Sequence, residues 1–216
     1  RITAQLIDAL TGGHIWSERF DRNFKDLFGL LDEITQAITV ALQVKLTDGE
    51  QARLWFGSTR NFEAWGYVVK GMGIFYSFGK ENMAKSRELF EKAIEIDRNY
   101  SHAVTMLGWT HKIDAEFGWS DSKTESLKRA FELANKSVAM NDKSPIVHSL
   151  LSLIYLIQGQ HDKAIEEGRK AITFGPNDAE AHSLFGEALF WSGMFEDAVE
   201  MYEKAIRLHP NTPLYM

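Results

Sequence analysis

The 216-residue sequence contains no cysteine and no long hydrophobic run. Without cysteine the chain can form no disulfide, no thiolate nucleophile and no cysteine-ligated zinc site, and this composition suits a cytoplasmic protein. No stretch of about 18 or more apolar residues occurs, so we expect no transmembrane helix. The first residues also show no signal-peptide pattern.

Positive charge is scarce as well. Lys and Arg total 24 against 30 Asp and Glu, which gives a net charge of −6. Nucleic acids and anionic membranes select basic surfaces, so we expect neither as a partner. The sequence also lacks P-loop, GxGxxG, HExxH and GxSxG motifs. We therefore predict no catalytic residue, no cofactor and no enzymatic activity for these residues.

What the sequence does contain is a pattern that repeats about every 34 residues and is clearest between positions 145 and 216. Small and turn-forming residues return at the same places in two successive copies: Ala164 as Ala198, Ala171 as Ala205, Gly159 as Gly193, and Pro176 as Pro210. This period, with fixed small residues and a closing proline, is typical of the tetratricopeptide repeat (TPR), a pair of antiparallel α-helices. The small residues are required where the paired helices touch.

Extended backwards, the pattern predicts four repeats, near residues 64–100, 101–144, 145–178 and 179–212. In the second repeat the alanine of the second helix comes ten residues late. We assign the extra residues to a loop around 116–123. Its large side chains, Phe117 and Trp119, form a second candidate binding surface, although packing back onto the first helix of the same repeat is the favoured interpretation.

The part of the sequence before these repeats follows other patterns. Alternating apolar residues on either side of Thr11-Gly12-Gly13 predict a β-hairpin. Apolar residues from Phe24 to Leu46 recur at helical spacing and predict a long amphipathic helix, with Asn23 as its N-cap. Residues 47–61 are predicted to form a linker. The predicted fold is mainly α: a TPR α-solenoid of four helical hairpins (62–216), preceded by the hairpin and helix of a truncated α/β domain (1–46).

In a TPR stack, positions 2, 5, 9 and 12 of each first helix line a concave groove. Here they predict a protein-binding groove lined by Trp65, Val68, Met72, Phe75, Thr105, Trp109, Lys112, Ser149, Leu153, Leu156, Glu187 and Phe190. His102, Ile146, Glu180 and Ser183 occupy the same positions. The lining is largely aromatic and aliphatic, and it lacks the Lys and Asn set that clamps a C-terminal carboxylate.

An amphipathic helix or an extended apolar peptide would suit such a groove. Trp65, Trp109 and Phe190 are the predicted binding hot spots. The alternative is that the chain's own N-terminal helix fills the groove, or that neighbouring helices cover it. A second alternative is a self-association scaffold, in which the hairpin edge pairs with its copy in a symmetric homodimer.

Seven histidines are the candidate metal ligands. No two of them lie four residues apart around a carboxylate, the helical spacing of a zinc site. His148, His161 and His182 fall at repeat positions that usually hold packing side chains, so packing is favoured over metal binding. Acidic pairs such as Glu166-Glu167 are interpreted as solvated helix faces. We predict no metal site.

The N-terminal phrases IDA, TGGHIW and LDEIT, followed by VKLTDGEQARLW and by repeats with LGWTH and FGWS, resemble a group of bacterial proteins. In that group a class III adenylate/guanylate cyclase domain, or a winged-helix DNA-binding domain, precedes a TolB-like α/β segment and TPRs. The resemblance implies that residues 1–46 are the end of the TolB-like segment. It also implies a regulatory, non-catalytic half of a signalling protein, with the cyclase's metal-binding aspartates in a domain outside these residues. A regulatory half of a winged-helix transcriptional regulator is the alternative.

Overall fold

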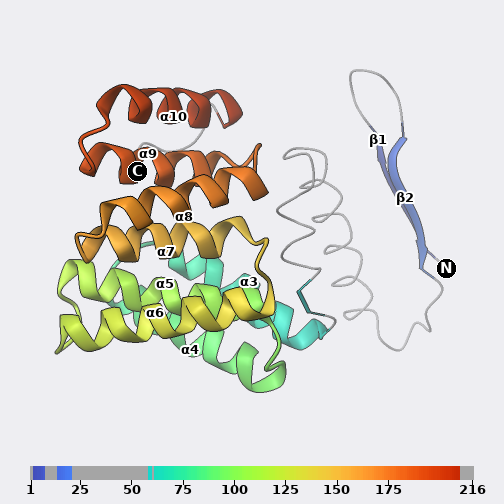
Figure 1. The fold of residues 1–216 in the computed structure, drawn as a ribbon. Coiled ribbons are helices and arrows are strands. Elements are labelled where there is room, and N and C mark those ends of the chain that lie inside the picture. Colours follow the sequence, from blue (N-terminus) through green and yellow to red (C-terminus); the bar gives the residue numbers. More distant parts are fainter. Residues whose placement is uncertain (1, 8–13, 21–57, 60, 210–216) are drawn as a thin grey trace. The chain divides into compact units, whose positions relative to one another are not determined.

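A computed structural model describes residues 2–7, 14–20, 58–59 and 61–209 (Figure 1). The chain divides into two units, residues 1–53 and 54–216. The helix predicted at residues 24–46, its N-cap Asn23 and most of the linker predicted at 47–61 lie outside the described residues.

In the first unit, two strands form an antiparallel pair, β1 (Ile2–Ile7) and β2 (His14–Phe20). Leu6 lies opposite Trp16, and the register shifts after Leu6. The strands lie where the alternating pattern predicts a hairpin, because side chains of a strand point to opposite faces in turn.

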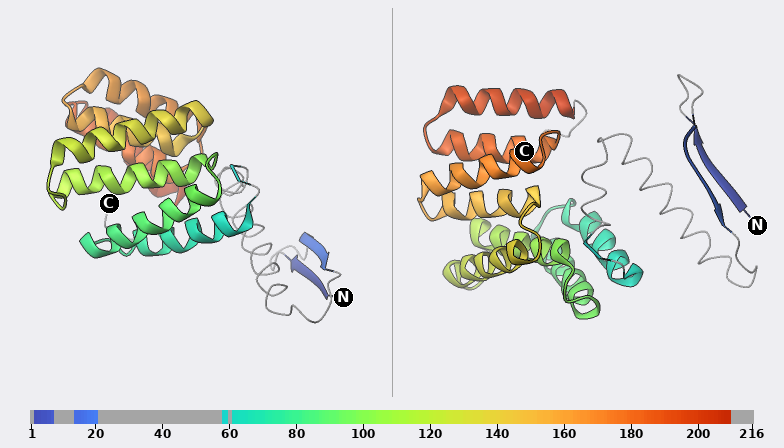
Figure 2. Two further views of the ribbon diagram at one scale, coloured as in Figure 1. Left: turned by 90° about the horizontal axis from the view of Figure 1, so that it is seen from below. Right: turned by 45° about the vertical axis from the view of Figure 1, so that its right-hand side comes forward.

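The described part of the second unit consists of eight helices in four antiparallel pairs. They are α3 (Phe62–Phe75), α4 (Lys80–Ile96), α5 (Ser101–Phe117), α6 (Lys123–Met140), α7 (Pro145–Ile157), α8 (His161–Phe174), α9 (Ala179–Trp191) and α10 (Phe195–Leu208). Each helix contacts the next along the chain, and the first helices of successive repeats also touch, α5 with α7 and α7 with α9. Figures 1 and 2 show this successive stacking from α5 to α10. The predicted TPR α-solenoid is confirmed.

Polar side chains mark where several helices begin. Asn61, Ser122 and Asp178 precede α3, α6 and α9, and each accepts a hydrogen bond from a backbone N–H in the first turn. These caps satisfy donors that have no partner within the helix. Pro145 opens α7, a position where its missing N–H is harmless.

Small residues lie where the two helices of a repeat approach closely. A Cβ atom on Gly71 would lie 2.5 Å from the ring of Phe90, and one on Gly186 would lie 2.9 Å from the ring of Tyr202. At the equivalent position of the third repeat, the Ser152 hydroxyl donates to the carbonyl of Ala164 at 2.7 Å. The repeat pattern thus follows from the space available at the helix contact.

The ten extra residues of the second repeat do not form a loop, contrary to our prediction. α5 has 17 residues against 13 in α7, and α6 has 18 against 14 in α8. The turn at 118–122 is only two residues longer than the turn at 158–160. Most of the insertion therefore lengthens both helices by about one turn each.

The boundary between these longer helices has clear local causes. Gly118 ends α5 with φ of 66°, a left-handed conformation that glycine adopts at low cost. The N–H of Trp119 then donates to the Asp114 carbonyl at 3.0 Å, and Ser122 caps α6 through the Glu125 N–H at 3.2 Å. The insertion is thus a stable extension of the repeat.

The buried side chains form two clusters. The larger one runs from α3 to α7, and the smaller one joins α8, α9 and α10 around Phe185, Leu189 and Ala198. Ile165 and Ile172 of α8 pack against the smaller cluster. In the described part of the chain, no helix combines the length and the hydrophobicity that crossing a membrane requires.

Candidate protein-binding cavity

A cavity of about 880 Å³ opens along the first helices of the repeats. The end of α3, residues of α5 from Met106 to Phe117, and residues of α7 and α9 form its walls. Helix α10 contributes Tyr202, Ala205 and Ile206. This volume lies within the range of about 300–1,000 Å³ that is usual for ligand sites.

One wall of the cavity is aliphatic. Met106 and Ile113 of α5 and Ile146 and Leu153 of α7 contribute it. Ile146 and Leu153 are seven residues apart, so they lie on one face of α7 two turns apart. Ile146 is its partly exposed member, whereas Met106, Ile113 and Leu153 are 2%, 7% and 2% exposed, so most of the apolar surface that this wall offers to an occupant is that of Ile146.

The facing helix, α9, presents a different surface. Glu180, Ser183, Leu184 and Glu187 all line the cavity. Their spacing along the sequence, at i, i+3, i+4 and i+7, places them on one face of α9. α9 therefore brings two carboxylates to a cavity that is otherwise largely apolar.

The surroundings disfavour ionisation of these carboxylates. Glu180 is exposed by surface area, yet desolvation between the surrounding helices, followed by the nearby charge of Asp178, raises its pKa. Burial also raises the pKa of Glu187, where Lys112 opposes the shift and Glu116 adds to it. Desolvation disfavours the charged form of a carboxyl group, and a like charge nearby does the same.

Among the described lining residues, Lys112 is the only lysine or arginine. It is buried, and its Nζ lies 2.8 Å from Oε2 of Glu116 and 5.7 Å from the centre of the Trp109 ring. This lysine is thus already engaged by a carboxylate and an aromatic face.

Two groups of aromatic side chains border the cavity. The Phe78 cluster consists of Phe78, Phe117 and Trp119, with ring centres 5.1–5.2 Å apart. Phe78 belongs to the turn between α3 and α4 and has φ of 40°, a strained conformation for a residue with a large side chain. Phe78 and Phe117 line the cavity and are both about half exposed.

Phe117 and Trp119 therefore stack on each other and on the turn of the preceding repeat. Trp119 thus packs on Phe117 of α5, the first helix of its own repeat, as the favoured interpretation expects, and both rings also contact Phe78 of the preceding repeat. The long α5 is the physical reason, since the extra turn carries Phe117 to Phe78.

The Trp191 cluster consists of Phe190, Trp191 and Phe195 at the junction of α9 and α10, where the ring centre of Phe190 lies 5.4 Å from that of Trp191 and 5.5 Å from that of Phe195. All three side chains are exposed, Trp191 by 64%. Trp191 lines the cavity, so exposed aromatic side chains continue from the cavity to the junction of α9 and α10.

The predicted groove residues fall into two sets. Five of them line the cavity: Phe75, Trp109, Lys112, Leu153 and Glu187. Phe117 of the predicted second surface lines it as well. Seven do not: Trp65, Val68, Met72, Thr105, Ser149, Leu156 and Phe190.

Most of the second set is buried inside the array. Trp65, Val68 and Met72 of α3 are 9%, 1% and 4% exposed. The hydroxyl of Thr105 lies 2.6 Å from that of Ser137 and donates to the Ser101 carbonyl at 3.0 Å. α3 as far as Met72 and the first turn of α5 are thus occupied by packing, and the cavity lies over the end of α3 and over α5 from Met106 onward. Binding through these seven residues stays a prediction.

Sequence reasoning missed the contribution of α10, because the positional rule considers only first helices. Phe195, Val199, Tyr202 and Ile206 recur at i, i+4, i+7 and i+11, a continuous apolar stripe. That spacing was the signal in the sequence that could have revealed the contribution of α10. Sequence reasoning also missed Tyr76, Trp191 and Glu116, which lie beyond position 12 of their repeats.

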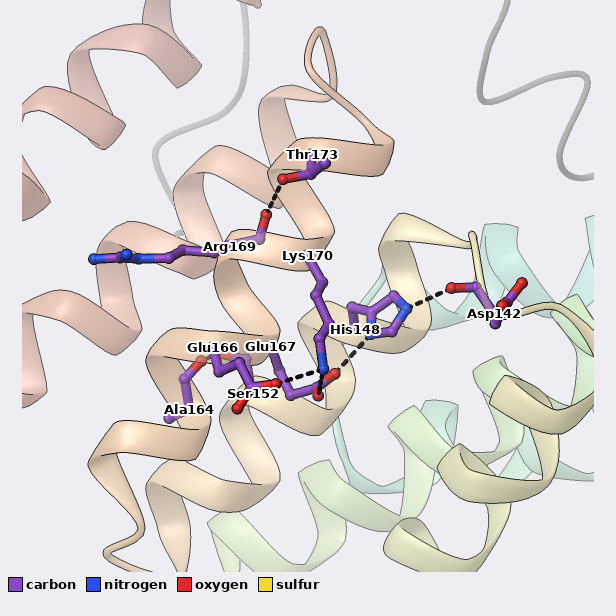
Figure 3. Close-up of polar contacts among 9 residues, drawn as sticks. All are labelled: Asp142, His148, Ser152, Ala164, Glu166, Glu167, Arg169, Lys170 and Thr173. Carbon is purple, nitrogen blue, oxygen red and sulfur yellow. Dashed lines mark hydrogen bonds and ion pairs between the residues drawn. The ribbon is translucent and has the colours of Figure 1, made fainter.

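His148 joins two helices and a loop (Figure 3). Its Nε2 lies 2.8 Å from the Asp142 carbonyl oxygen, and its Nδ1 lies 2.6 Å from Oε2 of Glu167. The other oxygen of this carboxylate, Oε1, accepts a hydrogen bond from Nζ of Lys170 at 2.8 Å. Both ring nitrogens face oxygen acceptors, so the arrangement is satisfied when the ring carries two protons. His182 of the fourth repeat likewise donates from Nε2 to the Pro176 carbonyl at 3.0 Å.

Other titratable groups lie inside the array. Burial lowers the pKa of His102 to about 4, so this ring is neutral at pH 7. The described residues include no group of three or more His, Asp or Glu side chains placed to hold a metal ion.

Comparison with known families finds TPRs in two parts of the chain. One tetratricopeptide-repeat model matches residues 155–215, and another matches residues 73–100. Both matches agree with the helical pairs described above.

A relative from Rhizobium meliloti (strain 1021), "Putative adenylate cyclase 3", is 33% identical over 153 residues. The match covers 71% of this chain but 26% of the relative, so the chain spans about a quarter of that protein's length.

Among solved structures, a thermophilic TPR protein of Thermus thermophilus aligns with a TM-score of 0.60 and 15% identity, over 82% of this chain and 92% of that one. At this identity the likeness concerns the fold alone. YrrB, described as a TPR protein with an unusual peptide-binding site, aligns at a TM-score of 0.44 and 19% identity, over 86% of this chain and 93% of that one. That score supports no argument about the site.

Proposed function

We propose that this chain is a non-catalytic protein-interaction and regulatory module of an adenylate/guanylate cyclase-like signalling protein. Its cavity binds a peptide or helix of a partner protein. The observation that supports this proposal is the cavity itself, about 880 Å³ with an aliphatic wall and exposed aromatic side chains at its border. Aromatic side chains around a concave apolar surface are typical of protein-binding sites.

The signalling context rests on the relative named as a putative adenylate cyclase. In this proposal residues 1–46 are the end of a TolB-like α/β segment, residues 47–61 are a linker, and residues 62–216 are the TPR array. Binding in the cavity would bias the activity of a catalytic domain elsewhere in the protein. Such coupling requires that the partner bind one state of the whole protein more tightly than the other.

Selection from a random peptide-display library on the purified chain tests the binding step. Selected peptides should bind the wild-type chain at least tenfold more tightly than a Trp191→Ser/Ile206→Ser variant, since both side chains are exposed and line the cavity. The matched control is Val69→Ser/Ile96→Ser, which removes two exposed apolar side chains outside the cavity lining. If no peptide is enriched, or if affinity falls equally in both variants, the cavity is not the binding site.

The regulatory step needs the full-length protein. A peptide that binds the cavity should change its nucleotide cyclase activity, and the Trp191→Ser/Ile206→Ser variant should lose that response. A cyclase with equal activity with and without saturating peptide would contradict the regulatory role.

A further inference from the structure

We propose that the occupant of the cavity is a basic amphipathic peptide segment. Its apolar side chains pack on the wall formed by α5 and α7, and its Lys or Arg side chains face Glu180 and Glu187 of α9. This inference rests on the proposed function, in that it assumes that a peptide binds the cavity.

The strongest argument is a difference between two equivalent helices. Glu180 and Glu187 occupy the positions in the fourth repeat that Ile146 and Leu153 occupy in the third. All four side chains line the same cavity. The fourth repeat thus presents carboxylates where the third presents aliphatic side chains, and an occupant meets an apolar wall on α7 and an acidic one on α9.

The charge balance of the cavity favours a cationic occupant. Its acidic lining residues are Glu116, Glu180 and Glu187, and Lys112 is paired with Glu116. No described cation lies within ion-pair distance of Glu180 or Glu187. A neutral apolar occupant would desolvate Glu180 with no described cation acting on it, and Glu187 with only the charge of Lys112 nearby, whereas an acidic occupant would be repelled. A Lys or Arg side chain would supply the missing partner.

Geometry sets the spacing of the cations. Seven residues along α9 separate the two carboxylates by about 10 Å. A helical occupant would match both with cations seven residues apart, and one in the polyproline II conformation with cations three residues apart, which lie on one face about 9 Å from each other.

Each carboxylate also has a tyrosine nearby. The charge of Glu180 contributes to the raised pKa of Tyr76, and the charge of Glu187 to that of Tyr202, after the larger effect of burial in both cases. Both tyrosines line the cavity. An aromatic face beside a carboxylate is a favourable place for an ammonium or guanidinium group.

This pairing makes affinity depend on pH. Because the pKa of Glu180 is raised, the free protein holds a proton there up to a higher pH than an ordinary glutamate does. A cationic side chain favours the ionised form, so affinity should rise as the pH increases from about 6 to 8. The other titratable groups near these carboxylates are Asp178, Glu116, Lys112, Tyr76 and Tyr202. His209 also lines the cavity, from the end of α10. Imidazoles titrate in a similar range, so the test includes a His209→Gln variant.

The experiment uses the peptides selected on the wild-type chain from the random display library. We expect them to contain more Lys and Arg than Asp and Glu. Their affinity should fall at least tenfold for Glu180→Gln/Glu187→Gln and should weaken with added salt. The matched control is Glu196→Gln/Glu200→Gln, two exposed carboxylates of α10 outside the cavity, which should bind as wild type does.

A second variant guards against misfolding. Glu180→Ile/Glu187→Leu gives α9 the side chains that α7 already presents, and it should select apolar peptides without basic residues. The rise of affinity between pH 6 and 8 should persist in His209→Gln and disappear in Glu180→Gln.

Two results separate this inference from the function on which it rests. Enriched peptides without an excess of Lys and Arg, or basic peptides that bind Glu180→Gln/Glu187→Gln as tightly as wild type, would overturn the inference and leave peptide binding intact. A selection that enriches nothing would overturn both.

Discussion

The third and fourth repeats share one sequence pattern and lie in different surroundings. In both, the histidine at position 4 donates to a carbonyl six residues earlier, His148 to Asp142 and His182 to Pro176. Yet Ile172 of α8 packs against the cluster shared with α9, whereas its equivalent in α10, Ile206, is 62% exposed. The local pattern determines the helical pair. Among the described elements, whether another helix packs on the outer face determines whether that face is buried or exposed.

The variant with the largest expected effect gives the third repeat the residue that the fourth repeat has at the same position. Gly168 of α8 corresponds to Tyr202 of α10, and a Cβ atom on Gly168 would lie 2.2 Å from the ring of Phe185. Gly168→Tyr should therefore displace α9 and lower the free energy of unfolding by about 3 kcal/mol or more. Urea denaturation measures this.

The matched control is Gly73→Tyr. Gly73 is an exposed helical glycine, and a Cβ atom added there would meet no atom within 4 Å, so the same substitution should be nearly neutral. Equal destabilisation by the two substitutions would show that close packing between the repeats does not limit position 168.

A smaller effect is expected from removing equivalent apolar side chains. Ile172→Ser should cost about 1–2 kcal/mol, since Ile172 is partly buried against the α9–α10 cluster. Ile206→Ser should change stability by less than about 0.5 kcal/mol, because that side chain is exposed. Thermal and urea unfolding of both variants would measure the difference. Equal losses would mean that something covers α10 in solution, as self-association would do.

The helical pairs were predictable because each is determined locally. The TPR period, with small residues at helix contacts, specifies two helices, and the close approach of Gly71 to Phe90 is its physical basis. The division of the ten-residue insertion was not predictable. The period reports how many residues are added, but their distribution between helix and turn depends on Gly118 ending α5 and Ser122 capping α6.

The cavity was only partly predictable, for a related reason. Positional rules found Trp109, Leu153 and Glu187, which face the cavity from first helices. The positional rules could not find Ile206, because they consider only first helices and Ile206 belongs to a second helix, α10. Among the described residues no helix packs over this side chain. The positional rules also placed Val68 in the groove, although packing buries it.

The polar link of the third repeat gives a further test with a defined pH dependence. Burial opposes ionisation of Glu167, but hydrogen bonds from His148 and Lys170 outweigh it and lower its pKa. A carboxyl group with a lowered folded pKa stabilises the fold above its unfolded pKa, and this contribution disappears as the pH falls through the folded value. Glu167→Gln should therefore cost about 1–2 kcal/mol at pH 7 and progressively less below about pH 4.

Unfolding measured from pH 3 to 7 would test this, with Glu166→Gln as the control, since Glu166 is more exposed and bonds only to Lys170 among these groups. A loss that is the same at all pH values would mean that Glu167 acts through packing and not through its charge.

The smallest effect is expected from giving the fourth repeat the carboxylate that it lacks. Met201 occupies the position in the fourth repeat that Glu167 occupies in the third, and Nδ1 of His182 is buried without a hydrogen-bond acceptor among the described residues. Met201→Glu should supply that acceptor and contribute about 1 kcal/mol, offset in part by the apolar contacts that Met201 makes with the α9–α10 cluster. The net change should stay within about 0.5 kcal/mol, so a double-mutant cycle with His182→Gln is needed to resolve the coupling. A favourable coupling would mean that the third and fourth repeats differ in this histidine–glutamate hydrogen bond only by the side chain at position 201. No coupling would mean that the bond between His148 and Glu167 also depends on how α8 packs against α9.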